Sequence, residues 1–288
     1  MPDLPRIGFL NSASQNGMRD LKGSFLDGLA AENFVEDQNV HITWKWAEGD
    51  YDGQLQQWAH DLVGEGVNVI ATTGGLVSAQ AAVRARGTQT TPILFIVGSN
   101  PAQLEFQQGT HGRPRNATGV NASATDNMQP RAQRFRQLTH ATKVALLLRP
   151  NTSVHGIEHG MAPGLGLTPI DVVNDNFAAA FQSAIRQGCN GILVTADPYF
   201  TSQRRTIVDL ARQNHLPAGY AWSQYVDAGG LMSYGASLAQ AYFDVGRYAG
   251  KILNGRPVEQ LPIIVEPPPH LIINEQTAKE LGLDISIK

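Results

Sequence analysis

The sequence predicts an α/β protein with two doubly wound parallel sheets, and three observations support this fold class. Short β-rich runs alternate with amphipathic helical stretches, which favours parallel strands joined by right-handed crossovers. The run at 92–97 is apolar throughout, as expected for a strand that helices cover on both faces. The alternation restarts after residue 143, and a length of 288 residues suits two domains.

The first series of elements is predicted from apolar periodicity. Val40, Ile42 and Trp44 share one face of a period-2 strand, whereas Leu21, Phe25 and Leu29 recur at helical spacing. The expected strands are 6–10, 40–46, 67–73 and 92–97, and the expected helices are 17–32, 52–65 and 75–86.

The second series repeats the plan of the first. Residues 68–73 and 190–195 each lead through a helix to a proline, Pro92 or Pro217, that opens the next strand. The expected strands are 143–148, 170–173, 191–195 and 217–222, with helices at 176–187 and 201–214. We therefore expect two similar lobes.

The C-terminal part breaks the alternation. We expect strands at 231–234, 263–265 and 271–274, with a long helix over 237–254 that ends near Gly255. Pro267–Pro269 cannot lie inside a sheet and suits an extended crossing between lobes. Two further crossings are expected near 116–120 and 230–235. The predicted lobes are 1–119 with 234–265, and 120–233 with 266–288.

Composition excludes several function classes. The formal net charge is −3, so there is no basic excess for binding nucleic acid. Cys189 is the single cysteine, which excludes an intrachain disulfide and any multi-cysteine metal site. No apolar stretch is long enough to span a membrane, and Met1–Pro5 runs directly into the first strand without a leader peptide. We therefore expect either a cytoplasmic protein or a mature form whose leader was removed.

Motifs of catalysis and cofactor binding are weak or missing. There is no P-loop, and Gly164-Leu165-Gly166 lacks the third glycine of a dinucleotide fingerprint. His155 to His159 matches the H-x-x-E-H pattern of some zinc peptidases, which requires one rigid helix. Because Gly156, Gly160 and Pro163 disfavour such a helix, we expect a surface loop there, with no metal and no cofactor.

Candidate binding residues follow the predicted strands of lobe 1, because ligands bind at the carboxyl ends of strands in open parallel sheets. Their small hydroxyl and amide side chains, and the helix starts beside them, can hold a carboxylate. Helix capping is the alternative role for each loop. The candidates are Asn11 and Ser12, then Thr73, Gly74 and Gly75, then Ser99 and Asn100.

The corresponding loops of lobe 2 carry a carboxylate and aromatic rings. The candidates here are Asp197, Tyr199, Tyr220 and Trp222. A buried carboxylate needs a partner, and aromatic faces favour planar or cationic groups. We therefore expect an amino acid rather than a sugar or an inorganic anion. The alternatives are an N-cap or Asx turn at Asp197 and packing within the lobe at Tyr220 and Trp222.

Several segments together resemble one known family. Tyr225-Val226-Asp227-Ala228-Gly229-Gly230-Leu231-Met232-Ser233-Tyr234-Gly235 is similar to a signature segment of the ABC-transporter substrate-binding proteins that include the tryptophan/tyrosine-type members. Segments 33–40, 46–49, 116–120, 196–198 and 274–283 agree with it in order and spacing. The resemblance covers nearly the whole chain and does not specify the ligand.

The resemblance implies a type I periplasmic binding protein fold, with two α/β lobes, three crossings and one ligand in the cleft. Two features depart from the family. Asn100 replaces the usual acidic residue, and the segment 151–169 is short and rich in Gly and Pro, which implies a thinner outer layer in lobe 2.

The function that the resemblance implies is that of a solute receptor for an ABC importer, not of an enzyme. We expect a small amino-acid-like or aromatic ligand, hinge closure, docking on a membrane permease, and a monomer in the periplasm or anchored outside the membrane. Two alternatives stay open at this point. One is a sensor that presents its closed form to a signalling partner; the other is an enzyme that uses Asp197 or the pair His155 and His159.

Overall fold

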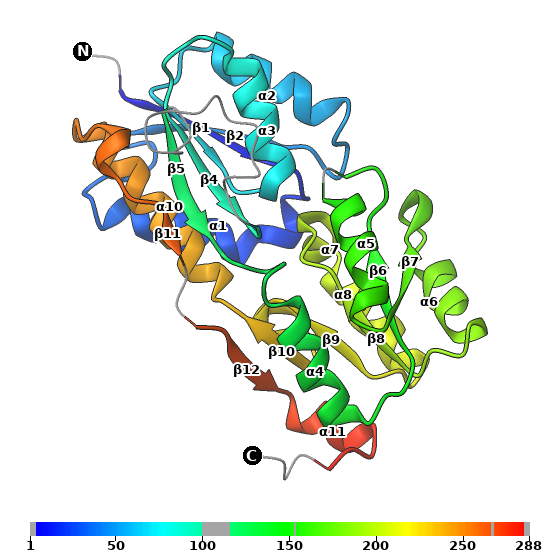
Figure 1. The fold of residues 1–288 in the computed structure, drawn as a ribbon. Coiled ribbons are helices and arrows are strands. Elements are labelled where there is room, and N and C mark those ends of the chain that lie inside the picture. Colours follow the sequence, from blue (N-terminus) through cyan, green and yellow to red (C-terminus); the bar gives the residue numbers. More distant parts are fainter. Residues whose placement is uncertain (1–3, 100–115, 153, 266–267, 285–288) are drawn as a thin grey trace. The chain divides into compact units, whose positions relative to one another are not determined.

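The computed structural model describes residues 4–99, 116–152, 154–265 and 268–284, which form two lobes (Figure 1). Lobe 1 comprises Met1–Ser123 and Ser237–Glu266, and lobe 2 comprises Ala124–Ala236 and Pro267–Lys288. The chain therefore passes between the lobes three times, and the third passage, at 266–267, lies outside the described residues.

Lobe 1 contains a six-stranded sheet whose paired strands are all parallel. Its strand order is β11-β5-β4-β3-β1-β2, so the first strand of the chain lies inside the sheet. The strands are β1 (Arg6–Asn11), β2 (His41–Trp46), β3 (Val69–Thr72), β4 (Ile93–Val97), β5 (Ala117–Asn121) and β11 (Ile264–Val265).

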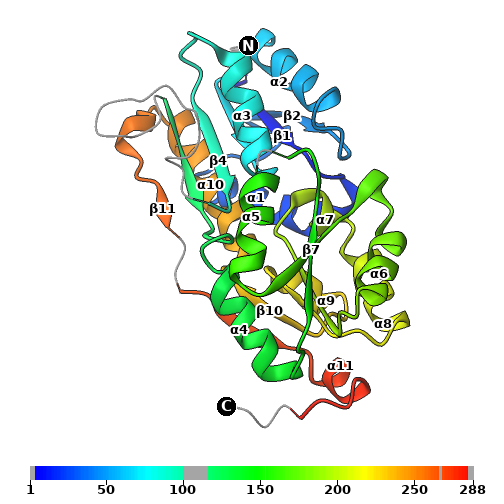
Figure 2. The ribbon, with the colours of Figure 1, turned by 45° about the vertical axis from the view of Figure 1, so that its right-hand side comes forward.

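Helices cover both faces of this sheet (Figure 2). Phe9 of β1 contacts Phe25 of one helix at a ring distance of 5.2 Å, whereas a Cβ at the neighbouring Gly8 would meet Leu62 of another. Since successive residues of a strand face opposite ways, these helices lie on opposite faces, which confirms the doubly wound prediction. The helices are α1 (Arg19–Ala30), α2 (Gln54–Gly64), α3 (Gly75–Arg86) and α10 (Leu238–Leu253), with 3₁₀ turns at Asn16–Met18 and Val258–Gln260.

Lobe 2 contains a second six-stranded sheet in the order β12-β10-β9-β8-β6-β7. Its strands are parallel except for β12, which pairs antiparallel with β10. The strands are β6 (Val144–Leu148), β7 (Leu167–Asp171), β8 (Gly191–Val194), β9 (Ala218–Tyr220), β10 (Met232–Gly235) and β12 (His270–Ile273). The helices are α4 (Met128–Thr139), α5 (His155–Gly164), α6 (Phe177–Arg186), α7 (Pro198–Ser202), α8 (Arg204–Gln213), α9 (Ser223–Asp227) and α11 (Glu275–Glu280), with a 3₁₀ turn at Val173–Asp175.

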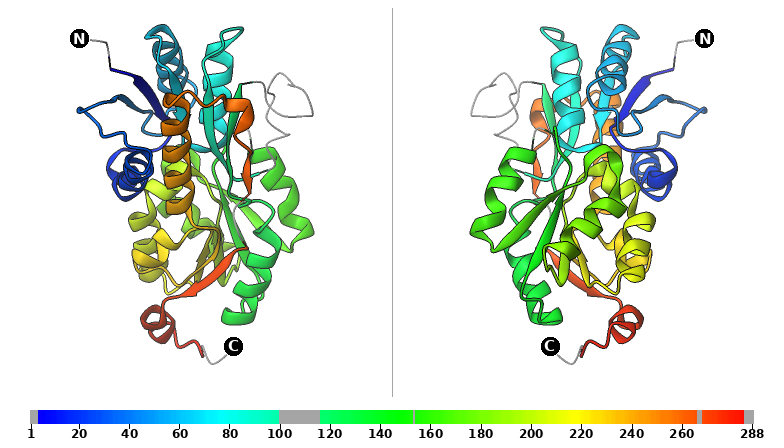
Figure 3. Two further views of the ribbon diagram at one scale, coloured as in Figure 1. Left: turned by 90° about the vertical axis from the view of Figure 1, so that its left-hand side faces the viewer. Right: turned by 90° about the vertical axis from the view of Figure 1, so that its right-hand side faces the viewer.

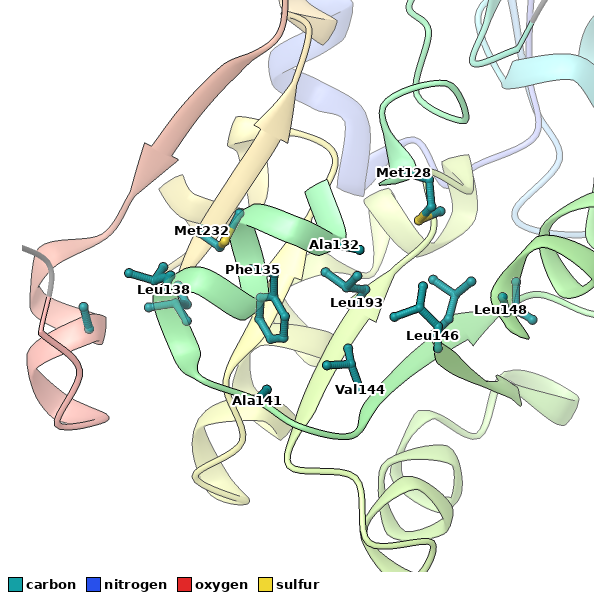
Figure 4. Close-up of a cluster of buried hydrophobic side chains, with 14 residues drawn as sticks. Met128, Ala132, Phe135, Leu138, Ala141, Val144, Leu146, Leu148, Leu193 and Met232 are labelled. Atoms are coloured by element: carbon teal, nitrogen blue, oxygen red, sulfur yellow. The ribbon is translucent and has the colours of Figure 1, made fainter. Parts of the chain in front are cut away.

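The core of lobe 2 is built around Phe135 of α4 (Figure 4). A Cβ at Gly191 of β8 would lie 2.7 Å from the Phe135 ring, and one at Gly219 of β9 would lie 2.9 Å from it. The two strand glycines therefore make room for one aromatic ring. Around it pack buried aliphatic side chains that include Ala132, Leu138, Val144, Leu146 and Leu193.

Some predicted boundaries and elements were wrong. Residues 116–120 and 230–235 belong mostly to strands β5 and β10, so the chain leaves each lobe only after completing a strand. The helix expected over 201–214 is two helices, α7 and α8, and α4 was not predicted at all. Four of the first seven residues of α4 are polar, which obscures the apolar positions of the helix.

The expected loop at 155–164 is also wrong, because this segment forms the helix α5. Glu158 and Ala162 are its buried residues and lie four positions apart, on the face that packs against β6 and β7. Gly156, Gly160 and Gly164 have open space around them, and Pro163 falls in the last turn. Burial of one helix face thus outweighs poor helix propensity. The outer layer of lobe 2 is not thinned here.

In lobe 1, α1 and α10 lie against each other at backbone distance (Figure 3). A Cβ at Gly28 of α1 would lie 2.0 Å from the carbonyl oxygen of Phe243, and one at Gly246 of α10 would lie 2.1 Å from that of Phe25. Only glycine allows this approach. Arg247 and Lys251 of α10 add ion pairs to Glu32 at 3.7 and 3.9 Å.

Among the described residues, none of the helices combines the length and the apolar character needed to cross a membrane. Cys189 is buried and unpaired by any disulfide.

Replacing Gly28 by alanine is expected to destabilise lobe 1 by about 1–3 kcal/mol or more, because the added methyl group overpacks the contact with α10. Gly23→Ala is the matched control on the same helix. A Cβ there meets nothing within 4 Å, so this variant is expected to gain about 0.5–1 kcal/mol from helix propensity. Urea unfolding of both variants measures the difference, and equal stabilities would contradict the close-contact account.

Candidate functional site

The loops that follow β1 and β3 meet at the carboxyl edge of the lobe 1 sheet. These strands are neighbours, with Leu10 opposite Thr72, so the residues after them are brought together. The Nδ2 group of Asn11 donates a hydrogen bond to Thr73 Oγ1 at 2.8 Å, and Ser12 Oγ donates one to the Gly74 carbonyl at 2.8 Å. A Cβ at Gly74 would lie 2.2 Å from the Ser12 nitrogen, so only glycine fits there.

A residue from the far end of the sequence completes this cluster. Tyr242 of α10 accepts a hydrogen bond from Asn11 Nδ2 at 2.9 Å and donates one to the Thr73 carbonyl at 3.2 Å. Burial raises the pKa of Tyr242 to about 12, so the phenol stays protonated and keeps donating. Sequence analysis treated Tyr242 only as an apolar position of a helix, and no local signal linked it to Asn11.

The start of α3 offers backbone donors beside this cluster. Gly74 is the N-cap and has no side chain to cap the helix, and Gly75 has a left-handed φ of 73°. The first N–H groups of a helix have no partner within it and carry partial positive charge, so they can bind an anion. Ser99 follows the adjacent strand β4 and is buried, whereas the predicted residue Asn100 lies outside the described residues.

The hydroxyl groups of Ser12 and Thr73 each already make one hydrogen bond within the protein. The single proton of the Ser12 hydroxyl points to Gly74, which leaves its oxygen as an acceptor. Thr73 Oγ1 already accepts from Asn11 and retains its own proton for donation. The donors that suit a carboxylate here are therefore the Thr73 hydroxyl and the amides at the start of α3.

In lobe 2, Asp197 follows β8 and is the N-cap of α7. One carboxylate oxygen accepts from the Phe200 nitrogen at 3.0 Å, and Pro198 occupies the first helical position. The capping role considered for Asp197 is therefore real, and it leaves the negative charge at this edge of the sheet. Tyr199 lies in α7, with the Arg149 guanidinium 4.1 Å from the centre of its ring.

Tyr220 and Trp222 are almost fully buried. The Tyr220 ring stacks on the Tyr225 ring with centroids 4.3 Å apart. A Cβ at Gly230 would lie 2.6 Å from the Tyr220 ring. Trp222 precedes α9 and is 4% exposed. This burial favours the packing role for both rings, and contact with a ligand stays a prediction.

Lobe 2 also buries two ionisable residues to which the candidate loops gave no pointer, one acidic and one basic. Glu158 in the first turn of α5 is 8% exposed, and Arg131 of α4 is fully buried. Arg131 Nε donates to the Tyr234 carbonyl at 2.9 Å and Nη2 donates to the Ala124 carbonyl at 3.0 Å. The only sequence signal for Glu158 was the H-x-x-E-H pattern, which is a zinc-site pattern and does not indicate a buried carboxyl group.

Burial shifts both groups towards neutrality. Desolvation and, to a smaller extent, the charge of Asp197 raise the pKa of Glu158, the charge of Arg131 opposes them, and the resulting pKa is about 8. Desolvation lowers the pKa of Arg131, Glu158 and Tyr234 partly offset it, and the resulting pKa of about 10 keeps the guanidinium charged at pH 7. The lobe 2 edge therefore holds two carboxyl groups in electrostatic contact.

The two histidines of the pattern do not form a metal site. His155 Nε2 lies 2.8 Å from Asp171 Oδ1, and the His155 and His159 rings are 5.5 Å apart. Within the ranges that the structure describes, no group of three or more His, Cys, Asp or Glu is placed to hold a metal ion.

A separate apolar cavity of about 290 Å³ lies in lobe 2, away from these groups. It is lined by residues of α8, α11 and β9 and by those just before β9 and β10. Of the predicted site residues that the structure describes, Tyr220 alone lines it.

Comparisons with known proteins agree with this architecture. The profile of the family described as "ABC transporter substrate binding protein" matches residues 6–287. A curated tyrosine-binding protein of Clostridioides difficile (strain R20291) is 20% identical over 294 residues, which cover 96% of this chain and 81% of the relative.

Solved structures show the same fold over the whole chain. A conserved domain protein from Vibrio cholerae has a TM-score of 0.84 at 21% identity, and an ABC protein from Streptococcus pneumoniae in complex with L-Trp has a TM-score of 0.81 at 22% identity. Each comparison covers 99% of this chain and 97% of the other. The two parallel-sheet lobes thus have the type I periplasmic binding protein fold. With the family profile matched from residue 6 to residue 287, the chain belongs to the ABC transporter substrate-binding proteins.

Proposed function

We propose that this chain is the solute receptor of an ABC importer and that its ligand is a free aromatic amino acid. Membership of the family supports the receptor role, because ABC substrate-binding proteins act outside the cytoplasm and work with a membrane permease. The tyrosine-binding relative and the structural neighbour solved with L-Trp support an aromatic amino acid.

The observation that carries the ligand class is the difference in charge between the two sheet edges. The lobe 1 edge presents the Thr73 hydroxyl and the uncapped start of α3, which suit a carboxylate. The lobe 2 edge presents the carboxyl groups of Asp197 and Glu158, which suit an ammonium group. A free amino acid carries both a carboxylate and an ammonium group. A sugar or an inorganic anion does not carry this combination.

Transport requires that the permease distinguish the loaded receptor from the empty one. We propose that the lobes close on the ligand about the three chain passages, each lobe moving as a body. Each lobe has its own sheet and its own core, which supports movement without change in secondary structure. A ligand shifts such an equilibrium only through contacts that it makes better in the closed form.

Saturating L-Trp or L-Tyr is expected to reduce the radius of gyration, because closure brings two lobes of similar size together. Small-angle X-ray scattering with and without ligand measures this change. The circular dichroism spectrum should stay the same in the far ultraviolet. A scattering profile that does not change although calorimetry shows bound ligand would contradict the closure mechanism.

Thr73→Val is expected to weaken amino-acid binding by roughly 10–150-fold, since it removes one hydrogen bond to a charged group, worth about 1.5–3 kcal/mol. The matched control is Thr72→Val at the preceding position, where Oγ1 donates to the Leu94 carbonyl at 2.9 Å within the sheet. Isothermal titration calorimetry should show near-parental affinity for the control. If both variants bind equally well, the Thr73 hydroxyl does not contact the ligand.

Asp197→Asn keeps an acceptor for the Phe200 nitrogen, because asparagine is as good an N-cap as aspartate, but it removes the charge. We expect affinity for L-Trp to fall by about 10–150-fold, the loss of one charge-assisted contact. Affinity for indole-3-propionate, which lacks the ammonium group, should not fall. The exposed Asp209→Asn on α8 is the control variant. Unchanged L-Trp affinity in Asp197→Asn would show that Asp197 serves only as a cap.

A further inference from the structure

Glu158 is a buried carboxyl group for which lobe 2 provides no direct partner. Its residue is 8% exposed, and in the described ranges no hydrogen bond and no ion pair within 4.0 Å reaches it. A buried polar group without a partner costs free energy, and such groups gather where a ligand supplies the missing contact. Glu158 therefore differs from Asp197, whose carboxylate already caps α7.

The topology of lobe 2 places Glu158 and Asp197 at one edge of the sheet. Strands β6 and β8 are neighbours in parallel register, with Leu147 opposite Val194. The helix α5 follows β6 and Glu158 lies in its first turn, while Asp197 follows β8 directly. This edge is the one at which open parallel sheets bind ligands.

The neighbouring charges do not neutralise Glu158. Arg131 of α4 is committed to two backbone carbonyls, and His155 on the same helix pairs with Asp171 of β7. The His159 ring lies 5.5 Å from that of His155 at a tilt of 54°, and Arg149 after β6 pairs with Asp175 at 3.4 Å. Asp197 adds a second negative charge, which raises the pKa of Glu158.

We propose that Glu158 binds the ammonium group of the ligand together with Asp197, and that its carboxyl group releases a proton to the solvent when the ammonium arrives. The step balances as a neutral carboxyl group plus an ammonium cation giving a carboxylate–ammonium pair and one free proton. This inference rests on the proposed amino-acid ligand. It identifies Glu158 as the residue that makes binding of the amino acid depend on pH.

The coupling has a defined sign. With its pKa raised to about 8, Glu158 is mostly protonated at pH 7, so binding releases a proton there. Affinity then rises with pH below about pH 8 and levels off above it. Without the carboxyl group, this dependence disappears.

Calorimetric titration of the full chain with L-Trp and L-Tyr in buffers of different ionisation enthalpy counts the released protons. We expect the parent to release most of one proton per bound ligand at pH 7. For Glu158→Gln we expect no release and weaker binding than the parent at pH 8. Glu280→Gln, at an exposed position of α11, is the control and should behave as the parent does. Indole-3-propionate should bind without proton release.

A second measurement tests the same carboxyl group without ligand. The folded state holds the Glu158 proton above the ordinary pKa of 4.5, so the free energy of unfolding should fall as pH rises from about 4.5 through about 8. The difference between the parent and Glu158→Gln in thermal unfolding isolates this dependence. Identical pH dependence in both proteins would overturn the assignment.

The outcomes separate this inference from the proposed function. If L-Trp or L-Tyr binds to the parent without releasing a proton, or if Glu158→Gln releases as many protons as the parent, the role of Glu158 is wrong and the amino-acid ligand stands. If neither amino acid binds at any pH, the ligand class is wrong, and the role of Glu158 fails with it.

Discussion

The close contact between α1 and α10 is the constraint on which lobe 1 depends. The chain reaches α10 only after it has completed most of lobe 2, so this helix joins a sheet formed more than a hundred residues earlier. Gly28 and Gly246 let the two backbones meet, and a methyl group at either position would occupy the space of a carbonyl oxygen. A helix held this closely can place a side chain beside the strand ends. Tyr242 does so, and it ties the loop after β1 to the loop after β3.

Both lobes present polar groups at the carboxyl edge of a parallel sheet, yet the chemistry differs. In lobe 1 the groups are uncharged and are organised by the hydrogen bonds of Asn11. In lobe 2 two carboxyl groups and Arg131 share a buried region, where desolvation and the neighbouring charges shift the pKa of Glu158 and of Arg131. Burial strengthens the electrostatic interactions of such charges and raises the free-energy cost of ionisation, because low-dielectric surroundings neither screen nor solvate them. An edge of this kind responds to a cation more strongly than a solvated surface would.

Much of the fold could be predicted because its signals are local. Strands such as 93–97 and 144–148 are continuous apolar runs, and the start and end of α3 coincide with the predicted 75–86. Errors arose where tertiary packing overrode local preference. α5 forms although it contains three glycines and a proline, since Ala162 packs into the lobe 2 core. α4 forms over a largely polar segment whose buried apolar residues, among them Phe135, pack in the lobe 2 core.

For the site, the sequence by itself determined which loops carry hydroxyl, amide and acidic groups, and at which strand ends they lie. Asn11, Ser12, Thr73 and Gly74 could be grouped from sequence because parallel strands end at one edge, a rule that needs no coordinates. Only the tertiary structure decided the partners of these groups. Tyr242 and Glu158 come from helices whose neighbours are set by packing between distant segments, and a pKa depends on how deeply a group is buried. Burial is a property of the assembled lobe and not of any short stretch of chain.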